Sequence, residues 1–526
     1  QWQDGSWGGW SDAFEEFNEL YLAENKKEVQ NVMTNNPAYK NAFCWWTAWE
    51  QCGSYDYGPT AVAGFRKYLM DYYGTIEKLN AGWRTEYKSF DDITPGYWKY
   101  VFGAEKLKDP LAWHRNAANF IRFREFCSKA YATRIAQKAR AVRAFDKRTH
   151  ISSNLSCNNI SSVMWMQWRP LIFEDTAQIT MKGSDMIGYD NYGTDDLMGA
   201  FYEVFDCFGD GKLRPMVREG STHAPQPELY ARTVWGNVAK GMRGMDTFVF
   251  HESGNRSRQG ELTKFGLCNM YDDGCPRPKL AAASDLYRAM HQLDHLLSET
   301  KRVRAVKPVA IYYSSICNLL QERPYASIFD PGPDNFFRVY ELMHANGYDV
   351  TFVTDRQIRE GGDWLKSLKA IVFVDATYIP TDVQEKVRDW VEQGGHVFAD
   401  AQCGSCDGYA FPTDEMTKWL GIQPVQQKKV DADAAAKLAF GYSAYSFDVI
   451  QRDALYKSSC EVKDAAGAEH PINRMLGKVM FSAMGYNEVK CTDGYVVLHE
   501  NNSRPYMTVR EHGKGSSVYF AGYVGT

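Results

Sequence analysis

The sequence predicts an α/β protein in which part of a (β/α)8 TIM barrel is followed by a second α/β domain and a β-rich segment. Three observations support this prediction. Helical and strand patterns alternate through residue 300, a second alternation of short apolar strands and helices begins at residue 301, and alternating β segments fill the chain from about residue 425. The predicted domains are therefore a TIM barrel over 1–300, a second domain over 301–425 and its β-rich continuation over 426–526.

The first half contains five apolar runs of barrel type. They end near residues 49, 154, 189, 218 and 250. The patterns between and around them predict helices at 11–36, 60–73, 73–83 (as a hairpin), 110–144, 170–180, 197–208, 228–242 and 279–299. A closed barrel needs eight strands. We therefore expect the first three strands to precede Gln1, so that this chain is a piece of a longer polypeptide.

The second half predicts a small doubly wound domain, because short apolar strands alternate with helices. The predicted helices are 334–346, ended by Asn346-Gly347, and 381–393, ended by Gly394-Gly395. The strands of this domain are expected at 306–313, 350–353, 370–374 and 396–399. The β-rich continuation is expected to hold strands at 442–449, 478–483, 495–498, 507–510 and 517–521.

Composition narrows the function classes. The 526 residues carry a net charge of −5, which gives no basic footprint for nucleic acid, and no apolar run approaches the roughly 20 residues that cross a bilayer. The 15 Trp, 32 Tyr and 28 Phe suit sugar stacking, although a large barrel core is the commoner cause of such richness. The twelve cysteines are scattered, and Cys403 and Cys406 form a lone C-x-x-C, so neither a metal nor a cofactor is expected. The sequence does not indicate a cellular compartment.

Two glutamates close short apolar runs in matching settings. Glu50 follows Phe43 to Trp49, and Glu219 follows Arg214 to Arg218. The carboxyl ends of barrel strands are where a TIM barrel builds its active site. Cleavage of a glycosidic bond typically needs two carboxyl groups that face one cleft, one as the proton donor and one as the nucleophile or base. For either glutamate alone, a surface salt bridge at a strand end is an equally good interpretation.

Several longer stretches resemble glycoside hydrolase family 42, the β-galactosidases with two catalytic glutamates on strands four and seven. The stretches are 64–83, 120–146, 185–192 and 241–253, and residues 305–422 resemble the trimerisation domain of that family. The resemblance implies that Glu50 is the acid/base, that Glu219 is the nucleophile of a retaining double displacement, and that the protein is a homotrimer. It also implies a glutamine-amidotransferase-like second domain without that activity, in which strand 370–374 runs into Asp375 and not a cysteine.

Departures from the family limit what the resemblance implies about specificity. Trp49 stands where the family has an asparagine that contacts the sugar 2-hydroxyl, and only Cys52 remains of a zinc-binding cysteine cluster. We therefore expect a β-galactosidase first, with β-mannosidase or another β-glycosidase of the clan as the alternative. An inactive sugar-binding or assembly protein is the alternative of a different class. The residues expected to bind the glycoside substrate are Trp49, Asn154, Tyr189, Tyr192, His251, Glu252 and, by resemblance, Glu261.

Overall fold

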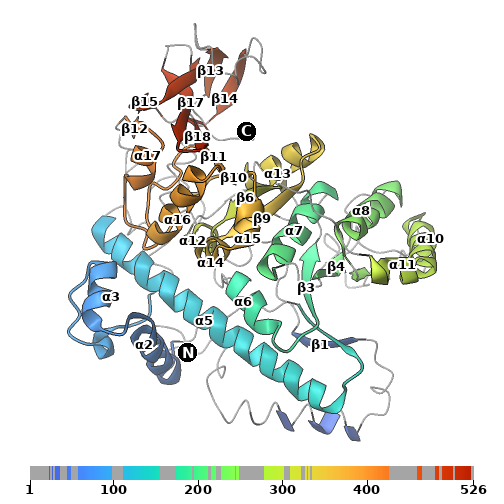
Figure 1. Ribbon diagram of the computed structural model, residues 1–526. Coiled ribbons are helices and arrows are strands. Elements are labelled where there is room, and N and C mark those ends of the chain that lie inside the picture. The colour runs from blue at the N-terminus through green and yellow to red at the C-terminus, as the bar shows by residue number, and fades with distance from the viewer. Residues whose placement is uncertain are drawn as a thin grey trace.

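The structure is a computed structural model of the 526-residue chain. It describes residues 44–48, 57–96, 110–154, 173–191, 195–210, 215–220, 227–242, 244–247, 278–300, 308–320, 326–327, 330–331, 335–425, 459–464, 480–484, 488–500 and 504–522, with single positions between 23 and 35. Two large sheets with their covering helices, together with two small two-stranded sheets, make up this part of the chain (Figure 1). The predicted helix at 11–36 and the predicted strand at 442–449 lie outside the described ranges, apart from those single positions.

The first half contains the five predicted strands in one sheet, ordered as in the sequence. They are β1 (Cys44–Ala48), β2 (His150–Asn154), β3 (Met186–Asn191), β4 (Pro215–Gly220) and β5 (Met245–Thr247). Every neighbouring pair is parallel. Parallel neighbours in sequence order, joined by helices, are the arrangement of a (β/α) barrel wall. Closure into eight strands stays a prediction.

The connecting helices are α5 (Pro110–Phe145), α6 (Phe173–Thr180), α7 (Asp195–Phe208) and α8 (Pro227–Lys240). The helix predicted at 279–299 is present as two, because α10 (Pro278–Gln292) ends before Leu293 and α11 (Asp294–Glu299) follows. Figure 1 shows α5 running across the first half, with α2 (Pro59–Tyr73) and α3 (Ile76–Trp83) beside its N-terminal part.

Local signals explain where α2 and α3 begin and end. Proline occupies the first turn of α2, and Gly74 caps its end at φ +73°, a conformation that glycine adopts without a Cβ penalty. The side chain of Thr75 then accepts a hydrogen bond from the Lys78 backbone N–H and so caps α3. Both helices pack on α5 through fully buried rings such as Phe65 and Phe123, whose centroids lie 5.2 Å apart edge to face.

The second half is built on a nine-stranded mixed sheet of order β14-β13-β16-β17-β18-β11-β10-β6-β9. Its parallel strands are β6 (Val309–Tyr313), β9 (Val350–Thr354), β10 (Ala370–Phe373) and β11 (His396–Ala399). The strands of the β-rich segment are β13 (Ser459–Asp464), β14 (Met480–Met484), β16 (Tyr495–Glu500), β17 (Pro505–His512) and β18 (Gly515–Phe520). Because β18 pairs in parallel with β11, the β-rich segment extends the sheet of the second domain.

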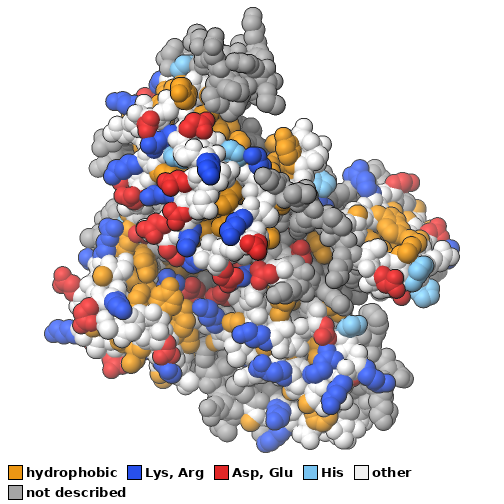
Figure 2. Space-filling model, in the orientation of Figure 1, with side chains coloured by type: hydrophobic (Ala, Val, Ile, Leu, Met, Phe, Trp, Pro, Cys, Tyr) orange, Lys and Arg blue, Asp and Glu red, His pale blue; other side chains and the backbone are white. Residues whose placement is uncertain are grey.

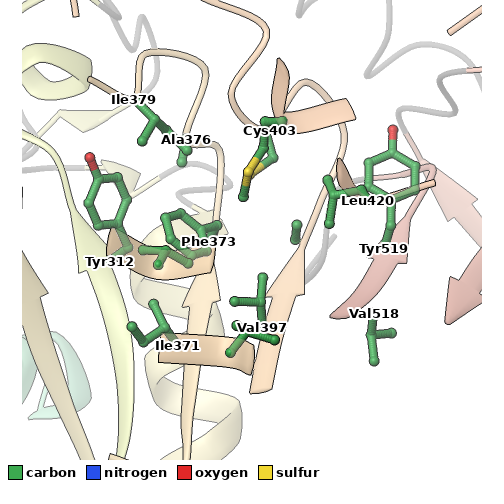
Figure 3. Packing of buried hydrophobic residues seen from close by; sticks show 14 of the residues in the cluster. Tyr312, Ile371, Phe373, Ala376, Ile379, Val397, Cys403, Leu420, Val518 and Tyr519 are labelled. Atoms are coloured by element: carbon green, nitrogen blue, oxygen red, sulfur yellow. The ribbon is translucent and has the colours of Figure 1, made fainter. Parts of the chain in front are cut away.

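Helices cover this sheet and bury its apolar residues. They include α12 (Ser315–Leu320), α13 (Asn335–Ala345), α14 (Asp355–Glu360), α15 (Asp363–Ser367), α16 (Thr381–Glu392) and α17 (Glu415–Trp419). Two further two-stranded sheets are β7 (Ala326–Ser327) with β8 (Asp330–Pro331), and β12 (Ile422–Pro424) with β15 (Val489–Cys491). Figure 3 shows side chains of β6, β10, β11 and β18, among them Phe373 and Val397, meeting in one buried cluster. A second cluster holds other residues of the same sheet, among them Tyr313 of β6 and Phe352 of β9, so the sheet is packed by two clusters of buried residues.

The two halves share a core. One cluster of buried residues joins Phe205 and Phe208 of α7 to Tyr313 of β6 and Phe352 of β9. The rings of Phe208 and Tyr313 lie 5.1 Å apart, edge to face. Burial of this kind makes the contact a packed interface that holds the second domain against the helices of the first sheet.

The surface shows no single-sign field on the face in Figure 2, where acidic and basic side chains are interspersed over the described residues. None of the helices in the described part of the chain has the length and apolar character of a membrane span.

Candidate active site

The carboxyl edge of the first sheet gathers the ends of all five strands. Since the strands are parallel, all five end at this same edge, and their last residues are Ala48, Asn154, Asn191, Gly220 and Thr247. In barrels of this architecture the loops that leave this edge build the active site. The structure thus places the strand ends on which the sequence-predicted site depends along one edge.

Glu219 lies on β4, one residue before the strand ends at Gly220. Its backbone partner on β3 is Asp190, a second acidic residue. The register with β3 shifts at this point, because Tyr189 pairs with Val217 while Asp190 pairs with Glu219. One extra residue of β4, Arg218, is thereby accommodated just before the glutamate.

The register between β4 and β5 shifts at the same place. Val217 pairs with Met245 and Gly220 with Thr247, so β4 carries an extra residue relative to this neighbour as well. A β-bulge bends its strand and redirects the side chains around it, and bulges are common beside active sites. The extra residue of β4 next to Glu219 is therefore seen relative to both neighbouring strands, β3 and β5.

The strand that leads to Glu50 has the same kind of irregularity. Trp46 of β1 pairs with Ser152, and Ala48 pairs with Ser153, so Thr47 is the extra residue. Glu50 itself, two positions after the end of β1, lies outside the described residues. In the sheet order, β2 and β3 lie between β1 and β4, the two strands that lead to these glutamates.

The remaining predicted site residues divide into two groups. Asn154 ends β2, where it pairs with Gly188, and Tyr189 lies on β3. Both therefore belong to strands that end at the carboxyl edge. The others lie outside the described residues: Trp49, Tyr192, His251, Glu252 and Glu261.

A polar network fixes β2 and β3 from the opposite, amino end of the sheet. Asp185, just before β3, accepts a hydrogen bond of 2.8 Å from the Ile151 backbone N–H and forms an ion pair with Arg143. Arg143 also donates to the Thr149 carbonyl oxygen at 2.8 Å, and the hydroxyls of Ser153 and Ser184 lie 2.7 Å apart in the buried interior. These bonds hold the two strands in register, which is what a preorganised edge requires.

Sequence reasoning missed the three register shifts and the pairing of Asp190 with Glu219. Neither leaves a signal in the local pattern, because a bulge depends on which residues the neighbouring strand presents. Metal binding has no support among the described residues, where no group of three or more His, Cys, Asp or Glu side chains is placed to hold an ion.

Comparisons with known proteins show one family model and one curated relative that are similar to this chain. The family model of glycoside hydrolase family 42, described as "Beta-galactosidase", matches residues 10–203. A β-1,2-glucosyltransferase from Ignavibacterium album is 20% identical over 523 residues, covering 90% of this chain and 69% of that protein.

Solved structures share the fold. The β-galactosidase from Rahnella sp. R3 has a TM-score of 0.67 at 14% identity and covers 96% of this chain and 70% of its own. The β-galactosidase from Bacillus circulans sp. alkalophilus has a TM-score of 0.67 at 15% identity and covers 97% of this chain and 70% of its own. Through the family match and this shared fold, the chain resembles glycoside hydrolase family 42, and it is a glycosidase.

Proposed function

We propose that the protein is a retaining β-glycosidase whose leading substrates are β-galactosides. Glu219 is the nucleophile and Glu50 the acid/base in this proposal. The observation that carries it is the repeated irregularity at the carboxyl edge: β1 and β4, the two strands that lead to these glutamates, each take up one extra residue shortly before them. Bulges at that edge serve to redirect side chains. Curvature of the sheet into a barrel would bring the ends of these two strands to face one another.

The proposed reaction has two steps. The Glu219 carboxylate attacks the anomeric carbon while the Glu50 carboxyl protonates the glycosidic oxygen, so that the C–O bond to the aglycone breaks and a glycosyl ester forms. Glu50, now ionised, takes a proton from water, and the resulting attack on the anomeric carbon releases the sugar and restores Glu219. Both displacements invert the anomeric centre, which gives net retention.

Variants of the two glutamates test the proposal. We expect Glu219→Gln and Glu50→Gln each to lower kcat/KM for an aryl β-galactoside by roughly a thousandfold or more. The matched control is Glu77→Gln, because Glu77 is exposed on α3 and the substitution is chemically the same. If Glu219→Gln retained most of the activity while folded, as judged by circular dichroism, the assignment of the nucleophile would be wrong.

Specificity is the second part of the test. An indole at position 49 has one N–H donor and no acceptor, so it cannot replace both functions of the asparagine amide that contacts the 2-hydroxyl in the family. Comparison of aryl β-galactosides with aryl β-glucosides and β-mannosides measures the consequence. Turnover of the galactoside without the mannoside supports the leading substrate, and the reverse preference would leave the mechanism and remove galactose.

Glucosyl transfer is a second candidate, because the relative from Ignavibacterium album carries that activity in its name and aligns with 90% of this chain. The chemistry needs only a change of acceptor, since a sugar hydroxyl replaces water in the second displacement. Product analysis with an aryl β-glucoside and excess glucose separates the two. Disaccharide as the main product would favour transfer, and free sugar alone would favour hydrolysis.

A further inference from the structure

The contact between the first and second halves places one guanidinium among three carboxylates. Arg356, on α14, lies within ion-pair distance of Glu174 at 3.0 Å, Asp210 at 2.7 Å and Glu360 at 2.8 Å. Glu174 belongs to α6 and Asp210 follows α7, whereas Glu360 ends α14 itself. Figure 1 shows α6 and α14 next to each other at this contact. The group therefore joins segments about 180 residues apart in sequence.

The charges in this group do not balance if all the carboxyls are ionised. One positive and three negative charges leave an excess of negative charge around Arg356. Glu360 and Asp210 have 59% and 37% of their side chains exposed, so water stabilises their charge, whereas the Glu174 side chain is only 7% exposed. The excess therefore falls on Glu174, which is the carboxyl least able to remain ionised.

Hydrogen bonds tie Glu174 to the start of α14. The Thr354 hydroxyl donates to Glu174 Oε1 at 2.6 Å, and the Arg356 Nε–H donates to the same oxygen at 3.0 Å. Gln357 ties the two sides further, because its side-chain amide donates to the Cys207 carbonyl oxygen and to Asp210. The carboxyl thus lies at the centre of the contact.

The surrounding charged groups act on Glu174 in opposite directions. Burial raises the pKa of Glu174 to about 7; Thr354 and Arg356 oppose this, and the carboxylates of Asp355 and Asp175 add to it. Asp175 lies 3.5 Å from Lys129 of α5. Asp355 of α14 is buried as well: burial raises its pKa to about 6, while it accepts a hydrogen bond from Tyr312 and faces Arg359. Burial also raises the pKa of the Cys207 thiol, which lies beside Asp206.

We propose that this contact is a proton-dependent joint, closed when Glu174 carries a proton and loosened as the proton is lost. The proposal concerns the attachment of the second domain to the helices of the first sheet, and it is independent of the proposed function. Its consequence is an interdomain contact whose stability responds to pH in the range around neutrality.

The direction follows from proton linkage. The pKa of Glu174 rises from 4.5 to about 7 in the closed joint, so between these values the closed form holds a proton that the open, solvated form has released. Closure is therefore favoured at the acidic end and weakens as the pH rises to about 7, above which both forms are ionised. Because one pKa unit is a factor of ten and the pKa of Glu174 rises from 4.5 to about 7, the opening equilibrium changes by roughly three-hundredfold across this window.

Hydrogen–deuterium exchange of the whole chain at pH 5, 6, 7 and 8 measures the opening. After correction for the intrinsic pH dependence of amide exchange, protection of the amides in α6 and α14 should fall with rising pH in the wild type. Glu174→Gln, which keeps the acceptor oxygen and cannot ionise, should remove most of this pH dependence and leave only the part that Asp355 contributes. Glu360→Gln removes an exposed carboxyl from the same guanidinium and is the matched control, so it should retain the dependence. The same slope in the wild type and in Glu174→Gln would overturn the proposal.

A second variant keeps the test decisive if Glu174→Gln does not fold. Arg356→Gln removes the cation that stabilises the Glu174 carboxylate, so the proton is held to higher pH. The fall in protection of α6 should then occur at a more alkaline pH than in the wild type. A midpoint that stays in place, or moves toward acid, would show that Glu174 does not control the joint.

Discussion

Gln357 offers the sharpest test of how the two halves are joined. It is 8% exposed, and its side chain bonds on both sides of the interface. Its amide donates to the Cys207 carbonyl oxygen at 3.0 Å and to Asp210 at 2.9 Å, while its oxygen accepts from the Thr354 backbone N–H at 3.2 Å. Substitution by leucine keeps most of the volume and removes these three bonds, together with the bond that the Cys207 thiol donates to Gln357 Oε1 at 3.2 Å. The interface is therefore perturbed without a large cavity.

The expected loss in the free energy of unfolding follows from the groups that lose their hydrogen-bond partner in Gln357→Leu. The Thr354 N–H loses the Gln357 side-chain acceptor in a residue that is 1% exposed, which costs about 1–3 kcal/mol. The bonds to Cys207 and to the Asp210 carboxylate add about 1 kcal/mol each, although the Cys207 carbonyl keeps the Asp210 N–H as a donor. With the apolar gain of leucine set against these losses, Gln357→Leu should lower the free energy of unfolding by about 2–4 kcal/mol.

Urea denaturation followed by tryptophan fluorescence measures the change as a shift of the midpoint. Gln393→Leu is the matched control, because Gln393 is exposed at the end of α16 and the chemical change is identical. The control should stay within about 0.5 kcal/mol of the wild type. If both variants lost the same stability, the bonds of Gln357 across the interface would contribute nothing measurable and the reasoning would be refuted.

Two further predictions concern the backbone and the assembly. Gly421→Ala should lower the free energy of unfolding by about 3 kcal/mol or more, because a Cβ at this φ of +72° would lie 2.1 Å from the Asp493 carbonyl oxygen. Gly74 has a similar φ of +73°, but no atom lies within 4 Å of its Cβ position. Gly74→Ala should therefore lower the free energy of unfolding by only the roughly 1 kcal/mol of left-handed strain. Calorimetric melting of both variants checks the pair, and equal losses would show that crowding at Gly421 is relieved by movement. Residues 301–425 resemble a trimerisation domain, so we expect a closed cyclic trimer in solution, and light scattering that reports a monomer at micromolar concentration would contradict it.

The sequence alone determined the five strands of the first sheet and the helices that connect them, whereas in the second half it left several short helices and strands, such as α14 and β13, unpredicted. The proline at the first position of α2, the glycine after this helix and the threonine cap of α3 are local signals, and α2 and α3 begin and end within a few residues of their predicted bounds. The five apolar runs of the first half form the five parallel strands for the same reason, since periodicity and β-branched content act within a short window. The candidate site could be predicted to the same extent: Glu219 lies at the carboxyl end of its strand because that end is where the run stops.

The tertiary structure decided everything that depends on partners distant in sequence. The extra residues of β1 and β4 exist only relative to their neighbours in the sheet, and the pairing of β18 with β11 joins residues more than a hundred positions apart. Arg356 meets Glu174 for the same reason, because a local pattern specifies which face of a helix is buried and leaves open which helix covers it. The packing of the whole chain selects a long-range contact. Here the burial of α6 and α7 against the second domain brings the Glu174 carboxyl and the Arg356 guanidinium together.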